Sequence, residues 1–277
     1  MRIEKIFKKL KVNEDGIFVY QFKVNSQKEE LSLRKKVVEK VIKNYLKEIS
    51  FYHSIPVMDR EVKLFLKSIP QNGIILDAGA GWGWHWRNLD KQRKDVRVIL
   101  VDFVMENLFH AKNLLKDKIG KQIFLVHGDV TQLKFPDECF DGYWSVQCLQ
   151  HVPEFEKAIK EAYRVLKKEG LFANYSLNVA LIEKLIFKLL RKKNYVIRGF
   201  VKEHFYLERA SKRQIELLEN IFHNKVKVRF SEILYKPKLF YFTGRENSLL
   251  GKIDAYLSGS LKIWGLIARQ QSFYVKK

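Results

Sequence analysis

The sequence predicts an α/β domain built on a doubly wound, mostly parallel β-sheet. Two observations support this prediction. Short apolar segments alternate with segments of helical periodicity through the middle of the 277-residue chain, and this alternation is typical of parallel sheets covered by helices on both faces. A glycine-rich turn at residues 77–83 also follows the first apolar segment, and such turns let a backbone approach a ligand closely.

Five strands and two helices are expected in this middle region. Each predicted strand is a short apolar run, and the five are Gly73–Gly79, Arg97–Phe103, Gln122–Asp129, Phe140–Gln147 and Gly170–Asn178. Helices are predicted over Glu106–Asp117 and Pro153–Lys168, because their apolar residues recur at helical spacing. Gly170 ends the second helix and begins the fifth strand.

The two flanks are less regular. Residues 28–49 are rich in Lys, Glu and Leu and predict a helix before the first strand. Ser211–Phe222 predicts another helix, with Ser211 as its N-cap. Lys225–Ile233 and Ser272–Val275 are expected to form the last strands.

The net charge of +21 is unevenly distributed. Residues 1–70 hold 16 Lys and Arg against 9 acidic residues, and residues 179–277 hold 21 against 8. Residues 71–178 are nearly neutral, with 15 against 14. The flanks are expected either to meet an anionic partner, such as RNA, a phosphorylated small molecule or a lipid surface, or to be a solvated Lys-rich surface.

Leu181–Lys192 predicts a helix with an apolar stripe that is followed by Arg191-Lys192-Lys193. A core-facing helix is the commoner interpretation of such a stripe. The alternative is a basic amphipathic helix on an anionic membrane. No run approaches the roughly 20 uncharged residues of a transmembrane helix, so any membrane contact is expected to be peripheral.

A cytoplasmic location is the expectation from cysteine content and from the first residues. The chain has only Cys139 and Cys148, which are too few for a disulfide framework and lack metal-ligand spacing. The N-terminal residues do not predict a signal peptide. No metal site is expected.

The run Ile75-Leu76-Asp77-Ala78-Gly79-Ala80-Gly81-Trp82-Gly83 is the most informative segment of the sequence. A dinucleotide fingerprint would require a glycine near position 84, which is a tryptophan, and a phosphate-binding loop would end in Gly-Lys-Ser/Thr. A ligand with an amino acid part and a nucleoside, but no pyrophosphate, suits this turn better.

The segment resembles motif I of the class I S-adenosylmethionine-dependent methyltransferases, whose pattern is Asp/Glu-x-Gly-x-Gly-x-Gly. The resemblance implies a Rossmann-like, seven-stranded methyltransferase fold with helical additions at the N-terminus and after the fifth strand. It also implies that Asp77, Gly79, Gly81 and Gly83 hold S-adenosylmethionine.

Three later segments match the same family in order. Asp102 stands nineteen residues after Gly83 and, by the resemblance, accepts hydrogen bonds from the ribose hydroxyls, with Phe103 beside it. Asp129 and Val130 are expected at the adenine. The methionine end is assigned to Ser145 and Val146.

Leu149–Pro153 and Glu161–Lys167 resemble the subgroup that contains the ubiquinone and menaquinone methyltransferases. The resemblance covers residues 45–178 well. We therefore expect a single methyltransferase domain over residues 1–277. Residues 1–70 would form an N-terminal helical or lid segment, residues 71–178 the cofactor-binding core, and residues 179–277 a basic, substrate-side part with the last strands.

Several aromatic and imidazole side chains are candidates for the acceptor side. His151 follows the fourth strand, where an imidazole could remove a proton from the acceptor, or could simply pack ahead of Pro153. Trp82, Trp84 and Trp86, with His85 between them, could close over the sulfonium, or pack as core. Tyr52 and His53 precede the first strand in a possible lid.

The expected reaction is direct methyl transfer, without a metal, to a small-molecule or lipid-linked acceptor. RNA is an alternative acceptor because the flanks are basic. However, Ser145-Val146-Gln147-Cys148 stands where base-amino methyltransferases carry an Asn-Pro-Pro-Tyr-like motif. A further alternative is a methyltransferase-like binding protein that has lost catalysis.

Overall fold

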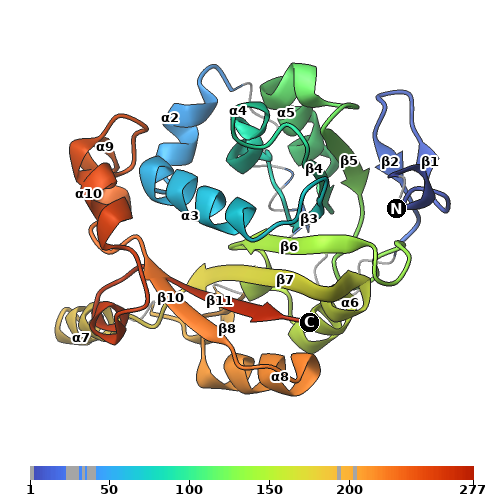
Figure 1. Ribbon diagram of the computed structural model, residues 1–277. Coiled ribbons are helices and arrows are strands. Elements are labelled where there is room, and N and C mark those ends of the chain that lie inside the picture. Colours follow the sequence, from blue (N-terminus) through green and yellow to red (C-terminus); the bar gives the residue numbers. More distant parts are fainter. Residues whose placement is uncertain (1–2, 23–30, 33–34, 36–41, 192–194, 202–204) are drawn as a thin grey trace.

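The centre of the computed structural model is a nine-stranded sheet in the order β1-β2-β5-β4-β3-β6-β7-β11-β10 (Figure 1). The structure describes residues 3–22, 31–32, 35, 42–191, 195–201 and 205–277. Seven strands form the predicted α/β sheet: β3 (Ile74–Ala78), β4 (Arg97–Asp102), β5 (Ile123–His127), β6 (Phe140–Val146), β7 (Leu166–Leu177), β10 (Lys227–Ser231) and β11 (Gln270–Lys276).

The strands β5, β4, β3, β6 and β7 are parallel, and β11 runs antiparallel to both β7 and β10. The five predicted strands of the middle region are confirmed, and so are the two last strands. Because β3 lies between β4 and β6, the carboxyl ends of these three strands meet at one edge of the sheet. The glycine-rich turn begins at that edge.

The N-terminal segment contains strands that the sequence did not predict. β1 (Lys11–Val12) and β2 (Phe18–Val19) form a hairpin, and β2 pairs in parallel with β5, which extends the expected seven strands to nine. Half of the residues in the helix predicted over 28–49 lie outside the described part of the chain. Within the described part of residues 1–70, α2 (Tyr45–Ser50) and α3 (Ile55–Lys67) are the helices of more than one turn.

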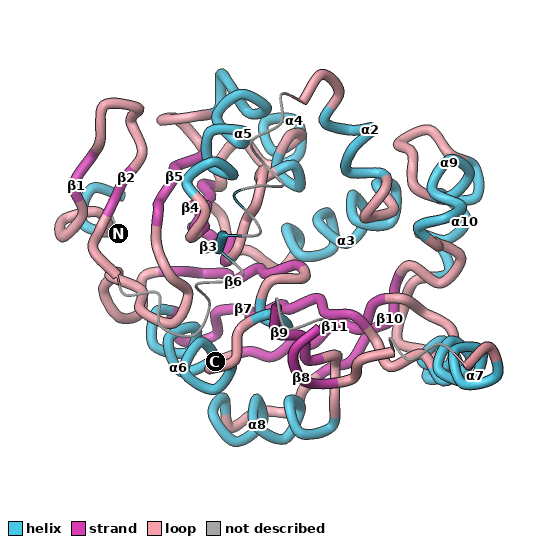
Figure 2. The backbone as a smooth tube through the Cα atoms, turned by 180° about the vertical axis from the view of Figure 1, so that it is seen from behind, coloured by secondary structure: helices cyan, strands magenta, loops and turns pink. Residues whose placement is uncertain are grey.

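Helices cover both faces of the sheet, as Figures 1 and 2 show. One face packs against α3, the short helices η2 (Trp84–Trp86) and α4 (Leu89–Gln92), and α5 (Met105–Leu115). The other face packs against α6 (Phe155–Val165) and α8 (Lys212–Phe222). The predicted N-cap of α8 is confirmed, since the side chain of Ser211 accepts a hydrogen bond from the backbone N–H of Gln214.

Several elements follow β7. They are α7 (Leu181–Leu189), the hairpin of β8 (Arg198–Val201) and β9 (Phe205–Glu208), α9 (Phe240–Thr243), α10 (Leu249–Leu257) and the single turns η5 (Pro237–Leu239) and η6 (Lys262–Leu266).

The core-facing interpretation of the α7 stripe is wrong. Its apolar residues are exposed, and no residue of α7 is buried by the described part of the chain. The same apolar spacing suits a core helix and an interfacial helix, and only the position of the helix in the fold distinguishes them.

Candidate active site at the carboxyl edge of the sheet

The turn after β3 requires glycine at three alternate positions. Gly79, Gly81 and Gly83 have φ angles of 70°, 54° and 61°, in the left-handed region where a Cβ is unfavourable. The backbone N–H groups of Gly79 and Ala80 donate to the carbonyl of Val101, at 2.8 and 3.1 Å. This spacing of glycines therefore folds the chain back over the end of β4.

The three glycines differ in what surrounds them. A Cβ on Gly79 would collide with the Cys148 side chain, and one on Gly83 would collide with Leu100. A Cβ on Gly81 would have no described atom within 4 Å. Gly79 and Gly83 are thus required by packing, whereas Gly81 leaves an open approach to the backbone of the turn.

Asp102 joins the end of β4 to this turn. Its Oδ2 accepts a hydrogen bond from the N–H of Gly81 at 2.8 Å, and its Oδ1 accepts from the N–H of Val104 at 2.9 Å. The amide of Asn107 donates to the same Oδ1 at 3.2 Å. The carboxylate is 4% exposed, so it is held rigidly in the position that the sequence assigns to the ribose.

Asp77 is buried beneath the turn, and its Oδ2 accepts a hydrogen bond from Nε1 of Trp86 at 2.7 Å. Burial raises the pKa of Asp77 to about 7, against the opposing effect of the Trp86 hydrogen bond. A buried indole N–H requires a partner, and Asp77 supplies it. Trp86 therefore belongs to the core, as the packing interpretation expects.

The segment predicted to meet the adenine lies at the end of β5. The Asp129 side chain accepts a hydrogen bond from the N–H of Thr131 at 2.8 Å, and Val130 is buried beside it. Nε2 of His127 lies 3.1 Å from the carbonyl oxygen of Phe103, which places Phe103 between this segment and Asp102. Asp102, Phe103, Asp129 and Val130 thus lie together at the ends of β4 and β5.

Tyr20, which sequence reasoning missed, covers this end of the site. Its hydroxyl donates to the carbonyl of Asp129 at 3.2 Å, and a Cβ on Gly128 would overlap its ring. Burial raises the pKa of Tyr20, which keeps the hydroxyl a donor. The contact depends on the pairing of β2 with β5, and a two-residue strand gives almost no sequence signal.

Residues after β6 lie against the turn at its other end. Oγ of Ser145 donates to the carbonyl of Ala78 at 2.9 Å and is fully buried, so this side chain ties β6 to β3. Gln147 has a φ of 50°, and its N–H donates to the carbonyl of Tyr175 at 2.7 Å. Its buried Nε2 has no hydrogen-bond partner among the described residues. From the sequence, the methionine end of the cofactor is expected at the two preceding residues, Ser145 and Val146.

His151 contacts the β8–β9 hairpin. Its Nδ1 lies 2.8 Å from the carbonyl oxygen of Tyr206, and its Nε2 lies 3.0 Å from Nε2 of Gln150. A carbonyl only accepts, so Nδ1 carries the proton, and Nε2 accepts from the Gln150 amide. These contacts favour the packing interpretation of His151, and its catalytic role stays a prediction.

His85 is buried in an aromatic cluster on the α3 face of the sheet. Its ring stacks on Trp84 at a centroid distance of 4.2 Å and lies 5.8 Å from the ring of Trp144. Neither ring nitrogen has a hydrogen-bond partner in the described part of the chain. Burial, with smaller effects of His53 and Arg87, holds the pKa of His85 well below its usual value, so the imidazole is neutral.

A second imidazole, His53, lies beside this cluster, with a ring-centroid distance of 6.4 Å to His85. Its Nδ1 is 3.6 Å from Oε1 of Glu232, which also accepts from the N–H of Ser54 at 2.8 Å. Burial favours the protonated form of Glu232, but Arg269, His53 and Ser54 outweigh it and lower the pKa. The buried carboxylate is therefore ionised and orients the segment before α3.

Tyr52, the other candidate from this segment, is 59% exposed. The structure therefore brings together Trp84, His85 and His53, while Tyr52 lies at the outer surface. The place of His53 in the site could be predicted only weakly from the sequence. Its partner Glu232 lies 179 positions away, and no local motif joins the two residues.

Comparison with known proteins identifies the central segment. Residues 76–174 match the family model described as a methyltransferase domain. A ubiquinone/menaquinone biosynthesis C-methyltransferase of Rickettsia prowazekii is 37% identical over 114 residues, which are 39% of this chain and 46% of that protein. A sterol 24-C-methyltransferase of Aspergillus fumigatus is 32% identical over 104 residues, 36% of this chain and 27% of that protein.

The chain thus spans less than half the length of these curated relatives. Among solved structures, a possible histamine N-methyltransferase of Thermotoga maritima is similar at a TM-score of 0.57 and 16% identity. The likeness covers 90% of this chain and 97% of that one, and it supports the fold. Residues 76–174 therefore form a methyltransferase domain that resembles the ubiquinone/menaquinone C-methyltransferases, and the fold is similar to that of an S-adenosylmethionine-dependent methyltransferase.

Proposed function

We propose that the chain transfers a methyl group from S-adenosylmethionine to a small-molecule or lipid-linked acceptor. The observation that carries the proposal is the open position at Gly81. Gly81 has a left-handed backbone conformation, and a side chain at this position would meet no described atom. Its N–H donates a hydrogen bond to Asp102. The left-handed φ by itself favours glycine here, and the open space in addition leaves room for a ligand to approach the backbone of the turn.

The residues that would hold the cofactor follow the carboxyl edge of the sheet. The turn from Asp77 to Gly83 would take the amino acid part, with Ser145 supporting β3 from behind and Val146 and Gln147 lying at the end of β6. Asp102 and Phe103 would meet the ribose. Asp129 and Val130 would meet the adenine, with Tyr20 closing that end.

The cofactor supplies a methyl group on a positively charged sulfur, which is already electrophilic. The chain has to align the acceptor, exclude water and take up a proton where the acceptor loses one. Neutral His85 is able to accept a hydrogen bond from the acceptor, because its ring nitrogens have no partner within the described residues, while its lowered pKa makes it a weak base. Ionised Glu232 would hold His53 beside it.

The class of acceptor is supported by the two sequence relatives, which are named for ubiquinone/menaquinone biosynthesis and for a sterol. An apolar acceptor also suits the aromatic surroundings of His85, formed by Trp84 and Trp144. An extended anionic chain such as RNA would instead require a polar, basic lining at this position.

Calorimetric titration with S-adenosylmethionine and S-adenosylhomocysteine tests the cofactor site. Gly81→Ala should weaken binding about tenfold or more, because the new Cβ enters the approach to the turn. Gly120→Ala is the matched control, since Gly120 also has a positive φ and no described neighbour. Asp102→Ala should also weaken binding, whereas Asp141→Ala, which removes a hydrogen-bonded carboxylate near the start of β6, should not.

Unchanged binding by Gly81→Ala, or no binding by the folded wild type, would overturn this assignment. Saturable binding without turnover on any acceptor would favour the alternative of a catalytically silent binding protein.

Asp77→Asn should change how stability depends on pH. The pKa of Asp77 is about 7 when folded and 3.8 as a free side chain, so the folded state binds the proton more tightly. The free energy of unfolding of the wild type should therefore fall as the pH rises from about 4 to about 7. Relative to Asp77→Asn, the fall should be at most about 4 kcal/mol. Urea unfolding at pH about 5 and about 8 measures this, and parallel pH profiles for the two proteins would contradict it.

His85→Phe should raise the free energy of unfolding by about 1–2 kcal/mol, because it removes a buried imidazole that lacks partners in the described structure. It should keep cofactor binding and lose methyl transfer. His151→Phe provides the opposite control, since it leaves the Tyr206 carbonyl unpaired and should destabilise the fold. Urea unfolding of both variants measures these changes in the free energy of unfolding. A destabilised His85→Phe would show that the imidazole nitrogens of His85 have hydrogen-bond partners in the wild type.

A further inference from the structure

The helix α7 exposes an apolar face with no described segment covering it. Leu181, Ile182, Leu185, Ile186 and Leu189 are all exposed, Leu189 by 72%. The half-buried residues Glu183 and Phe187 lie on the opposite side of the helix, where Phe187 contacts the ring of Tyr195. α7 is thus attached to the body of the protein by one side and presents its apolar side outward.

A second exposed apolar surface follows β10. In α10, Gly251, Asp254 and Ala255 are buried, and the helix packs against α3. The other side of α10 is apolar and exposed, and Tyr256 is 82% exposed. The exposed apolar residues from α10 and its neighbours η5, α9 and η6 are Leu239, Tyr241, Phe242, Leu249, Leu250, Ile253, Tyr256, Leu261 and Ile263.

These two surfaces lie at the same end of the molecule, at the left of Figure 1 and the right of Figure 2. η6 connects them, because it contacts both α7 and β10, and β10 in turn contacts α10. We call the surface formed by residues 181–191 and 236–263 the apolar end. Contiguous exposed apolar surface of this extent marks an interaction site in proteins.

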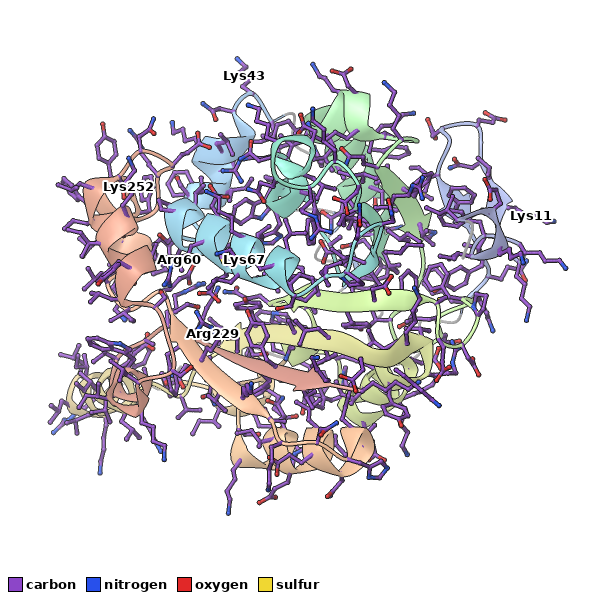
Figure 3. The ribbon with its side chains drawn as sticks, in the orientation of Figure 1. Lys11, Lys43, Arg60, Lys67, Arg229 and Lys252 are labelled. Atoms are coloured by element: carbon purple, nitrogen blue, oxygen red, sulfur yellow. The ribbon has the colours of Figure 1, made fainter. Side chains whose placement is uncertain are left out.

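The apolar end is also basic. Residues 181–191 and 236–263 hold eight Lys and Arg against three acidic residues. Of the acids, Asp254 is buried, Glu246 pairs with Arg87 and Glu183 is half-buried. The lysines on α7 and α10 are exposed, and Lys252 projects outward from α10 in Figure 3. Positive charge beside leucine, isoleucine and tyrosine side chains is the composition of helices that lie in a lipid interface.

We infer that the apolar end docks onto an anionic lipid bilayer, with α7 and α10 lying in the interface. The charge on the surface favours this occupant over a second copy of the chain, because self-association would bring two basic surfaces together. Within the described residues no helix is long and apolar enough to cross a bilayer. The nine residues of α7 reach about 14 Å, which suits a helix lying along the surface.

The apolar end is continuous with the candidate active site. The Oγ of Ser54, next to His53, donates to the carbonyl of Thr243 in α9 at 2.7 Å, and Phe51 packs on Phe240 at 4.0 Å. On the other side, α7 begins four residues after the carboxyl end of β7. A bilayer at this end would bring a lipid-linked acceptor to the edge of the sheet where the cofactor is proposed to bind. This link to the acceptor rests on the proposed function, whereas the docking does not.

Flotation with lipid vesicles, without cofactor, tests the docking. The full chain should float with vesicles of phosphatidylcholine and phosphatidylglycerol in equal parts, and much less with phosphatidylcholine alone. Leu185→Gln with Leu189→Gln should weaken this binding about tenfold or more. Lys184→Gln with Lys188→Gln should weaken it about tenfold, and added salt should weaken it further.

Lys157→Gln with Lys160→Gln is the matched control, because it removes the same charge from exposed positions of α6, at another part of the surface. Urea unfolding, which does not depend on the cofactor, separately verifies that each variant is folded. Equal binding to neutral and anionic vesicles, or wild-type flotation by the α7 variants, would overturn the inference. So would a stable dimer that the leucine variants disrupt, or preferential binding of RNA that they abolish.

Discussion

The candidate site depends on one hydrogen bond, from the N–H of Gly81 to the carboxylate of Asp102. The left-handed turn is costly for the backbone unless its residues are glycines, and it stays in place only if something outside the turn holds it. Asp102 does so from the end of β4, while Asp77 and Trp86 support the turn from below. Three strands and one short helix therefore meet at the point where the cofactor is proposed to bind.

A second buried carboxylate organises the opposite side of the edge. Glu232 joins Arg269, Ser54 and His53, so residues from before α3 and from the last strands converge beside His85. The same segments continue outward into α9 and α10. Burial of charge is expensive unless it is paired, and here the paired charge lies between the aromatic cluster and the apolar end. Cofactor binding, acceptor binding and membrane docking would thus occupy neighbouring parts of one edge.

Much of this arrangement could be predicted from the sequence because local patterns encode it. Apolar strands, the spacing of Gly79, Gly81 and Gly83, and Asp102 nineteen positions later predicted the sheet and the turn. Contacts between distant residues could not be predicted in this way. The bonds of Tyr20 to Asp129 and of His53 to Glu232 join positions more than a hundred residues apart. The α7 stripe was misassigned because its apolar spacing is the same in a core helix and an interfacial one.

The most direct test is methyl transfer itself, with S-adenosylmethionine labelled in its methyl group and a total membrane-lipid extract in anionic vesicles as the source of acceptor. We predict that label enters the organic-extractable fraction, that Gly81→Ala lowers its entry at limiting cofactor concentration, that His85→Phe abolishes it, and that Gly120→Ala does neither. Label confined to an RNA or aqueous fraction, or no label when the cofactor is bound, would contradict this account.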